Sequence, residues 1–206
     1  GTNGDIFVND TVTWNANTLI LDAFRNIEIN STLNGSGTAS LALYYGQGAA
    51  ASGNTATYKI NAPVNLPAGN NFSTKLGSDG TEIVYTVITE LGLQGDKDSS
   101  GHFTLQGLAN GGMLSGHYAL GANIVASGTL GWGSGTTAGF FPIGTASTPF
   151  TGIFDGLGHA ITGLYINRTG INYVSLFGYA NISSVIKNTG MVNVNITGWG
   201  DVGGLV

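Results

Sequence analysis

The stretch DIFVNDTVTWNANTLILDA (Asp5–Ala23) contains short runs of alternating apolar residues separated by asparagine and threonine. Two later stretches share its pattern, NIEINSTLNGSGTASLALYY (Asn26–Tyr45) and TYKINAPVNLPAGNNFSTKL (Thr57–Leu76). In each, an alternating apolar run ends on asparagine, another apolar residue follows three places later, and a second alternating run comes next. Short strands that recur every ~20–30 residues are typical of a stacked β-repeat.

The asparagines that end the first runs are Asn9, Asn30 and Asn61, at spacings of 21 and 31 residues. The longer spacing contains GQGAAASGNT (Gly46–Thr55), a segment of small residues that adds no strand. Stacked repeats tolerate insertions at one corner. We therefore predict that the three asparagines form a ladder in which each side-chain amide bonds the next repeat. The alternative is three unrelated turn residues.

A second repeat lies near the end, where YVSLFG (Tyr173–Gly178) aligns with VGGLV (Val202–Val206) and Leu176 falls on Leu205. One repeat cannot bury its inward side chains, but repeats stacked at about 4.8 Å cover one another and pair their backbones. We predict an all-β chain that forms a parallel β-solenoid with short excursions. A β-sandwich is the alternative, although the corners lack clear Asn-Gly or Asp-Gly hairpin signals between long alternating runs.

The middle of the chain is less regular. Residues 83–89 and 117–124 read as strands, whereas FTLQGLANG (Phe103–Gly111) has the apolar spacing of one or two helical turns packed over the solenoid. We expect one continuous solenoid over 1–206, with regular coils in 1–90, an excursion in 91–138 and further coils in 139–206. The N-terminal residues do not have the pattern of a signal peptide and the sequence stops within an apolar strand, so we expect a fragment of a larger protein.

Composition excludes several classes of protein. The net charge is −5 and the six Lys and Arg residues are scattered, so there is no basic stripe for a nucleic acid. No apolar run approaches the ~18 residues that membrane insertion requires. Cysteine is absent, which excludes disulfides and thiolate metal sites. Hydrophobic residues make up 42% of the chain, enough for a sizeable core.

Ordered motifs along the chain resemble filamentous haemagglutinin-like proteins, and more narrowly their segment with GLUG-type repeats. The motifs are YTVITELGLQG, LQGLANGGMLSGHYALGANI, GFFPIG, FTGIFDGLGHAITGLYINRTG, YVSLFGYA, VIKNTGMVNVNITG and DVGGLV, preceded by VTWNANTLILDAFRNIEIN. Relatives often have Ile-Asp-Ala after YALGAN, whereas this chain has Ile124, Val125 and Ala126 there, which argues against a carboxylate site at this point.

The resemblance implies a right-handed parallel β-helix within a large adhesin that Gram-negative bacteria export by two-partner secretion. It also implies a secreted, cell-surface location and attachment to host cells or surfaces. The implied partners are a host receptor, protein or glycan, and the outer-membrane transporter used during export. The segment resembles the shaft of such proteins rather than the tip.

The sequence Asp155-Gly-Leu-Gly-His159 raises the question of an acid and a base in a polysaccharide-cleaving enzyme. Glycoside hydrolysis requires two carboxylates about 5.5 Å apart, or ~6.5–9.5 Å apart in inverting enzymes, and no other acid falls in register with Asp155. We predict instead that Asp155 caps a turn, that Gly156 and Gly158 adopt left-handed conformations, and that His159 starts the next strand and bonds backbone.

Two metal-site hypotheses are weak. In GDKDSSG (Gly95–Gly101), Asp96, Asp98 and Ser100 alternate as calcium ligands do, but the downstream glutamate is missing and Lys97 lies among them. The three histidines, at positions 102, 117 and 159, match no zinc spacing. We predict no metal, no cofactor and no catalytic residue.

Aromatic residues give a further pair of alternatives, a sugar-stacking row on the surface or burial inside the coils, and we predict burial. They are Trp14, Trp132, Trp199, Tyr44, Tyr45 and Tyr165.

We predict that the chain is a non-enzymatic display segment, with recognition assigned to loops that interrupt the repeat. In Gln47–Thr55 the candidate residues are Gln47 and Asn54; in Leu93–Gly101 they are Asp96, Lys97 and Asp98. The alternatives are a β-helical polysaccharide lyase or glycoside hydrolase, and a module that captures haem or a host protein.

Overall fold

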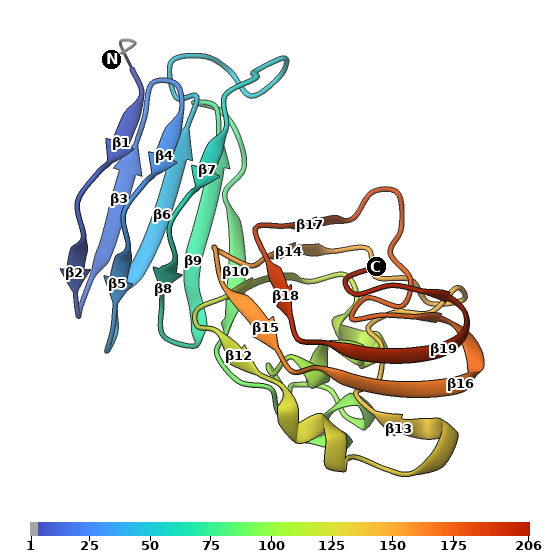
Figure 1. The fold of residues 1–206 in the computed structure, drawn as a ribbon. Coiled ribbons are helices and arrows are strands. Elements are labelled where there is room, and N and C mark those ends of the chain that lie inside the picture. The colour runs from blue at the N-terminus through green and yellow to red at the C-terminus, as the bar shows by residue number, and fades with distance from the viewer. Residues whose placement is uncertain (1–3) are drawn as a thin grey trace.

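The computed structural model describes residues 4–206, and this part of the chain is all-β, with helix confined to short 3-10 segments. None of its helices has the length and hydropathy needed to cross a bilayer. Two groups of strands lie side by side in Figure 1, with β10 between them. The all-β prediction is confirmed.

The first half of the chain passes three times through a set of three strands. Each strand pairs in parallel with its counterpart in the next set, which gives the sheet orders β1-β4-β7, β2-β5-β8 and β3-β6-β9. The strands are β1 (Ile6–Val8), β2 (Val12–Trp14), β3 (Thr18–Asp22), β4 (Ile27–Ile29), β5 (Leu33–Gly35), β6 (Ser40–Tyr45), β7 (Tyr58–Ile60), β8 (Val64–Asn65) and β9 (Gly69–Leu76).

The register of these strands is the one that the repeat predicts. Ile6, Ile27 and Tyr58 lie opposite one another along the first sheet. Inward side chains such as Leu33 and Phe72 are almost fully buried and form the N-terminal core. Because the inward side chains of one set rest on those of the next, stacking buries what a single set would expose.

The predicted asparagine ladder lies at the corner after the first strand of each set. Asn30 Nδ2 donates to Asn9 Oδ1 at 2.9 Å, and Asn61 Nδ2 donates to Asn30 Oδ1 at 2.7 Å. A second step of this kind, not predicted from the sequence, joins β8 to β5: Asn65 Nδ2 donates to Asn34 Oδ1 at 2.7 Å.

Strand direction reverses at β10 (Ile83–Ile88), which runs antiparallel to β9 and parallel to β11. The turn between β9 and β10 contains Asp79 and Gly80, an Asp-Gly pair between two alternating strands that the sequence analysis overlooked. The parallel stack is therefore interrupted at β10, whereas we expected one continuous solenoid over 1–206. The fold consists of two parallel stacks joined by an antiparallel pair.

The second half repeats the three-strand pattern in the reversed direction, with sheet orders β11-β14-β17, β12-β15-β18 and β13-β16-β19. All its pairs are parallel except β13 with β16. The strands are β11 (His117–Leu120), β12 (Ile124–Val125), β13 (Ala138–Gly139), β14 (Ile153–Asp155), β15 (Ala160–Thr162), β16 (Tyr165–Val174), β17 (Val185–Lys187), β18 (Gly190–Val192) and β19 (Asn195–Val202). The Leu176 N–H donates to the Gly204 carbonyl, the bond that pairing of Leu176 with Leu205 produces.

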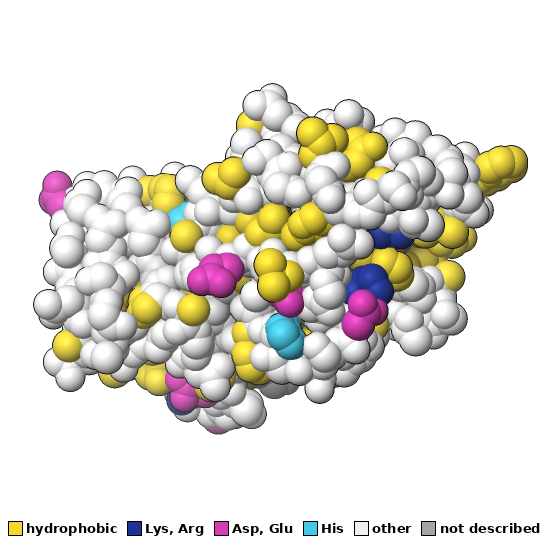
Figure 2. All heavy atoms as spheres, turned by 90° about the horizontal axis from the view of Figure 1, so that it is seen from below, with side chains coloured by type: hydrophobic (Ala, Val, Ile, Leu, Met, Phe, Trp, Pro, Cys, Tyr) yellow, Lys and Arg dark blue, Asp and Glu magenta, His cyan; other side chains and the backbone are white. Residues whose placement is uncertain are grey.

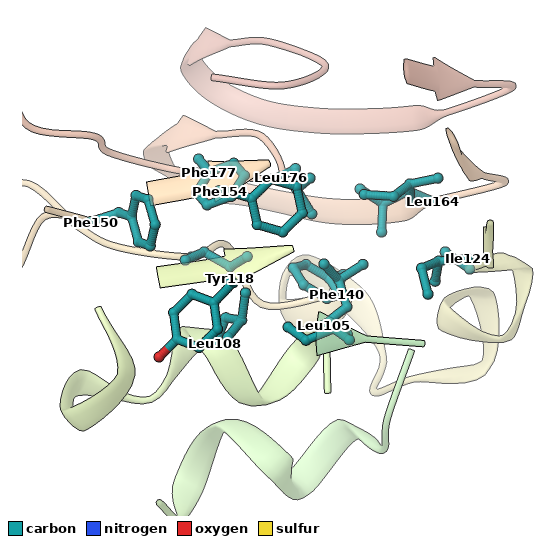
Figure 3. Packing of buried hydrophobic residues seen from close by; sticks show 14 of the residues in the cluster. Leu105, Leu108, Tyr118, Ile124, Phe140, Phe150, Phe154, Leu164, Leu176 and Phe177 are labelled. Atoms are coloured by element: carbon teal, nitrogen blue, oxygen red, sulfur yellow. The ribbon is translucent and has the colours of Figure 1, made fainter. Parts of the chain in front are cut away.

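The region 91–138 is only partly an excursion, since β11 and β12 in it belong to the stack. The rest contains the 3-10 segments η1 (Gln94–Asp98), η2 (Gln106–Ala109), η3 (Gly111–Met113), η4 (Ser127–Gly131) and η5 (Gly135–Thr137). The predicted helical turn is η2, and Leu105 and Leu108 at this turn are fully buried in the C-terminal core. Figure 3 shows both leucines below Phe154 and Phe177, with Leu108 at the level of the Tyr118 ring.

One seven-stranded sheet, of order β17-β14-β11-β10-β9-β6-β3, is shared by the two stacks, and the two cores lie on its opposite faces. On β11, Tyr118 and Leu120 belong to the C-terminal core, whereas Ala119 between them belongs to the N-terminal core. Since successive side chains on a strand point to opposite faces, β11 presents a different core on each side. The reverse face of β11 and β14 therefore closes the end of the N-terminal stack.

The asparagine ladder generates a stability prediction. Replacing Asn30 by Ala removes two ladder bonds, whereas Asn61→Ala removes one. Because these side chains are exposed, each bond lies at the low end of the usual range, about 0.5 kcal/mol. We expect urea denaturation to give a loss of about 1 kcal/mol for Asn30→Ala and about half of that for Asn61→Ala. Equal losses would contradict a ladder.

Candidate functional site

The turn between β14 and β15 contains Asp155 and His159, the pair that the sequence analysis singled out. Asp155 ends β14 on the face that points toward the N-terminal core, and its side chain is 0% exposed. Leu157, in the turn, is fully buried in that same core. The turn is therefore part of the joint between the two stacks.

The Asp155 carboxylate is bound by groups from three parts of the chain. Its Oδ2 accepts from the Tyr58 hydroxyl at 2.6 Å, and the Lys187 Nζ lies 3.7 Å from the same oxygen. Its Oδ1 accepts from the Leu157 N–H at 3.0 Å and from Asn188 Nδ2 at 2.9 Å. A buried carboxylate needs such donors, because desolvation of an unpaired charge is costly.

The electrostatics of the cluster follow from burial. Desolvation raises the pKa of Tyr58 well above its usual value, and the nearby Asp155 raises it further. Desolvation lowers the pKa of Lys187, although the attraction of Asp155 opposes that shift. The Lys187 Nζ also lies 4.0 Å from the centroid of the Tyr58 ring. Tyr58 is therefore a neutral hydrogen-bond donor rather than a proton acceptor.

The turn has the predicted cap with one change of conformation. Asp155 accepts from the N–H two residues ahead, the expected capping bond. Gly158 has a left-handed φ of +83°, as predicted, but Gly156 does not; Leu157 has it instead, with φ +48°. Gly156 is required for space, because a Cβ there would lie 2.4 Å from the Cβ of Thr189.

His159 precedes β15 and bonds backbone, as the sequence analysis predicts. Its Nε2 lies 2.9 Å from the Val64 carbonyl oxygen, which joins the C-terminal half to β8. A carbonyl only accepts, so Nε2 carries the proton and Nδ1 has the lone pair. Among the described residues Nδ1 has no partner, and burial lowers the pKa of His159 despite the bond to Val64.

These contacts show that the side chains of the turn hold the two stacks together. Asp155 is closed to solvent and His159 bonds Val64 rather than Asp155, so the two do not form an acid and base pair. A hollow of about 400 Å³ beside His159 is lined mainly by small and amide side chains. Three residues of this cluster were not predicted from the sequence: Tyr58, Lys187 and Asn188. The strand spacing could have indicated Lys187, because it lies opposite Asp155 in the pairing of β14 with β17.

The predicted recognition residues of the first loop are occupied internally. Gln47 Nε2 donates to the carbonyl oxygens of Tyr45 and Gly77, each at 3.1 Å. Asn54 Nδ2 donates to the Gly46 carbonyl at 2.8 Å and holds the base of the loop. The side chains of Gln47 and Asn54 therefore stabilise the loop rather than extend from it.

The second loop is similar. Asp96 is buried, accepts from the Leu93 N–H and the Thr104 hydroxyl, and lies 3.1 Å from His102. These hydrogen bonds and His102 lower the pKa of the Asp96 carboxyl, although burial opposes that shift.

Lys97, the next residue of this loop, forms an ion pair with Asp98. Its Nζ also lies 4.8 Å from the centroid of the Phe141 ring.

No metal centre is evident in residues 4–206, since no group of three or more His, Asp or Glu side chains converges there. The histidines are dispersed: His102 contacts Asp96, His117 packs on the Tyr85 ring, and His159 bonds Val64.

The aromatic side chains that could have stacked on sugars do not form a single row. Trp132 stacks on Phe140 at the C-terminal core. Trp199 is 79% exposed, so the prediction of burial is wrong for this residue.

Removing the Asp155 carboxylate should loosen the joint. Asp155→Ala leaves the Tyr58 hydroxyl and Lys187 without their partner, and breaking a buried charged cluster costs about 3–5 kcal/mol. We expect urea denaturation to show a loss in this range, with Asp10→Ala, at an exposed acid, as the matched control. A loss of the same small size in both variants would show that the carboxylate does not hold the joint.

His159 should give stability a pH dependence. Its folded pKa is lowered from a usual value of 6.5, so the unfolded chain binds the proton more readily. The contribution of His159 to the free energy of unfolding is fully present above about pH 6.5. It is lost as the pH falls toward the folded pKa, by up to about 1.4 kcal/mol per pH unit. Urea denaturation from pH 8 to pH 5 should show this loss. His159→Gln keeps a donor for Val64 and should remove that part of the dependence; an unchanged profile would contradict the assignment.

Comparison with known proteins gives two partial matches. The chain is 42% identical over 91 residues to halomucin of Haloquadratum walsbyi, which covers 42% of this chain and 1% of halomucin. It is 39% identical over 59 residues to a putative Gly-rich membrane protein of Evansella cellulosilytica, covering 29% of this chain and 7% of that protein. No family model and no solved structure matches. The chain thus spans only a small part of each relative.

Proposed function

We propose that the chain is a segment of a right-handed parallel β-helix that serves as the shaft and display segment of a large, secreted surface adhesin. The observation that carries the proposal is the in-register pairing of corresponding strands across successive three-strand sets. Such pairing satisfies the backbone groups of each set through its neighbours and gives a stiff, extended support. The partial matches, each to a small part of a relative, agree with a segment that belongs to a longer chain.

The winding geometry supports one handedness throughout. At β10 the strand direction reverses, and the core also moves to the opposite face of the shared sheet. The order of strands along that sheet continues in the same sense from β3 to β17. Reversing both the strand direction and the side on which the core lies leaves the sense of winding unchanged. Both stacks of the proposed β-helix therefore have the same hand. Right-handed crossovers are strongly preferred between parallel strands, which favours the right-handed form.

The titratable groups support a display role over catalysis. The Asp155 carboxylate is inaccessible, and Asp96 is buried and bonded within its own loop. In the proposed role the adhesin is exported through an outer-membrane transporter and attaches to a host receptor, protein or glycan. This segment then holds the binding surfaces away from the cell.

Hydrogen exchange tests the stiff-shaft part of the proposal. Amides of β4, β5 and β6 lie between two paired neighbours, so they should exchange only on global unfolding. We expect them to exchange at least about a hundredfold more slowly than amides of Gln47–Thr55, as followed by mass spectrometry or NMR. Fast exchange of both groups would contradict a stiff stack.

Incubation with polysaccharides tests the enzymatic alternative. We expect no new reducing ends and no absorbance from unsaturated products when the purified chain is mixed with neutral and acidic polysaccharides. The conservative variant Asp155→Asn provides the control. Product formation that disappears in this variant would overturn the display role and favour a β-helical lyase or hydrolase.

A further inference from the structure

The outer face of β3, β6, β9 and β10 carries a shallow hollow of about 270 Å³, which we call the outer-face hollow. Its shape follows from a row of four residues in register. Ile20 lies opposite Ala42, Ala42 opposite Ser73, and Ser73 opposite Val84. Ile20 is 53% exposed and Val84 is 50% exposed, while the two residues between them are small. The hollow is therefore a gap in side-chain volume between two apolar walls.

The strands fix which side chains line this hollow. The alternating neighbours Leu19, Leu41 and Phe72 point inward to the N-terminal core, so Ile20, Ala42 and Ser73 must point outward. The floor of the hollow consequently rests on a buried sheet and not on a mobile loop. Its geometry is set by the same register that stacks the coils.

Polar groups line one edge of the outer-face hollow. The hydroxyls of Thr18 and Ser40 lie 2.7 Å apart, and either can donate outward. The side-chain oxygen of Asn70 accepts from the Thr86 hydroxyl at 3.0 Å, which leaves the Asn70 amide N–H groups available. This edge thus offers both donors and acceptors at the strand ends.

An aromatic ring and a carboxylate lie on the opposite edge. The Tyr44 hydroxyl donates to Glu82 Oε1 at 3.0 Å, and the Lys75 Nζ lies 5.9 Å from the ring centroid. Burial raises the pKa of Tyr44, and Glu82 and Asp22 raise it further, as two nearby carboxylates would. Tyr44 is therefore fixed in orientation, and Glu82 keeps acceptor capacity for a further donor.

We propose that the outer-face hollow binds a neutral saccharide. A sugar ring has an apolar face, which the Ile20 and Val84 walls and the Tyr44 ring can contact, and a rim of hydroxyls, which Glu82, Ser40 and Asn70 can bond. The net charge of −5 and the Glu82 carboxylate disfavour an acidic sugar. The hollow is smaller than drug-sized sites, so it accepts one sugar unit with a Kd in the millimolar range.

This inference deepens the proposed display role by naming a ligand class, and it rests on that role only for its biological setting. Binding by the purified chain is measured separately from the stiffness of the stack. A failure to bind sugar would leave the hydrogen-exchange result intact, and rapid exchange in β4–β6 would leave a measured sugar affinity intact.

The test is an NMR titration of the purified chain with glucose, galactose, mannose, N-acetylglucosamine and, as an acidic comparison, glucuronic acid. We expect at least one neutral sugar to saturate, with amide shifts centred on Ala42, Ser73 and Val84, and glucuronic acid to bind more weakly. Absence of saturation for every sugar, shifts confined to another region such as Trp199, or stronger binding of glucuronic acid would overturn the proposal.

Variants make the test specific. Ser73→Leu fills the hollow from its floor without removing a polar wall group, and we expect affinity to fall at least about tenfold. Thr13→Leu places the same side chain on an exposed residue of β2, outside the hollow, and should leave affinity unchanged. Ile20→Ala removes one apolar wall and should weaken binding several-fold, which provides a second test should Ser73→Leu not fold. Unaltered affinity in the folded hollow variants would overturn the assignment.

Discussion

In-register parallel pairing between successive strand sets is the constraint on which the rest of this structure depends. Each set is too small to bury its own apolar side chains, and several strands have only two or three residues. Pairing makes the core collective, because Ile27 and Leu33 are buried only while the sets before and after them are in place. A slip of one residue would turn every inward side chain outward. Register therefore determines the core, the asparagine ladder and the outer face together.

The joint between the two stacks covers one end of the N-terminal stack. A stack of paired strands has open ends with unpaired edges and exposed core residues. Here the third set of the N-terminal stack is covered by the reverse face of β11 and β14, and the Asp155–His159 turn bonds to Tyr58 and Val64. The buried carboxylate makes this contact directional, because its four partners fix where β7, β14 and β17 meet. An apolar joint would be less specific about that position.

The sequence allows the repeat unit to be predicted in detail, but not the change of direction. Strand spacing and the asparagine ladder can be predicted because they depend on residues at equivalent points of neighbouring repeats. The Asp155 cap can be predicted because it depends only on residues within one turn. Asp79-Gly80 is the hairpin signal for the antiparallel pair of β9 and β10, and it was overlooked because we expected the corners to lack such signals. The Tyr58 bond to Asp155 joins residues 97 positions apart in different stacks, so no periodicity points to it. The same applies to the loop that contains Gln47 and Asn54. It looks free in sequence, but Gln47 bonds the Gly77 carbonyl just after β9 and Asn54 bonds the Gly46 carbonyl at the base of the loop.

These outcomes change where recognition should be sought on a stacked β-chain. Loops that interrupt a repeat are the usual candidates for recognition, but the side chains of Gln47, Asn54 and Asp96 form hydrogen bonds that hold the loops in place. Outward strand residues are constrained differently: the inward neighbours hold the strand in place, so a small residue such as Ser73 can lie beside a large one such as Val84 without loss of core packing. A hollow made in this way has a rigid floor and requires no loop ordering on binding, which lowers the entropic cost of a weak ligand. In a longer chain with many such sets, several weak sites on one rigid face would act together, and avidity would follow from their fixed spacing.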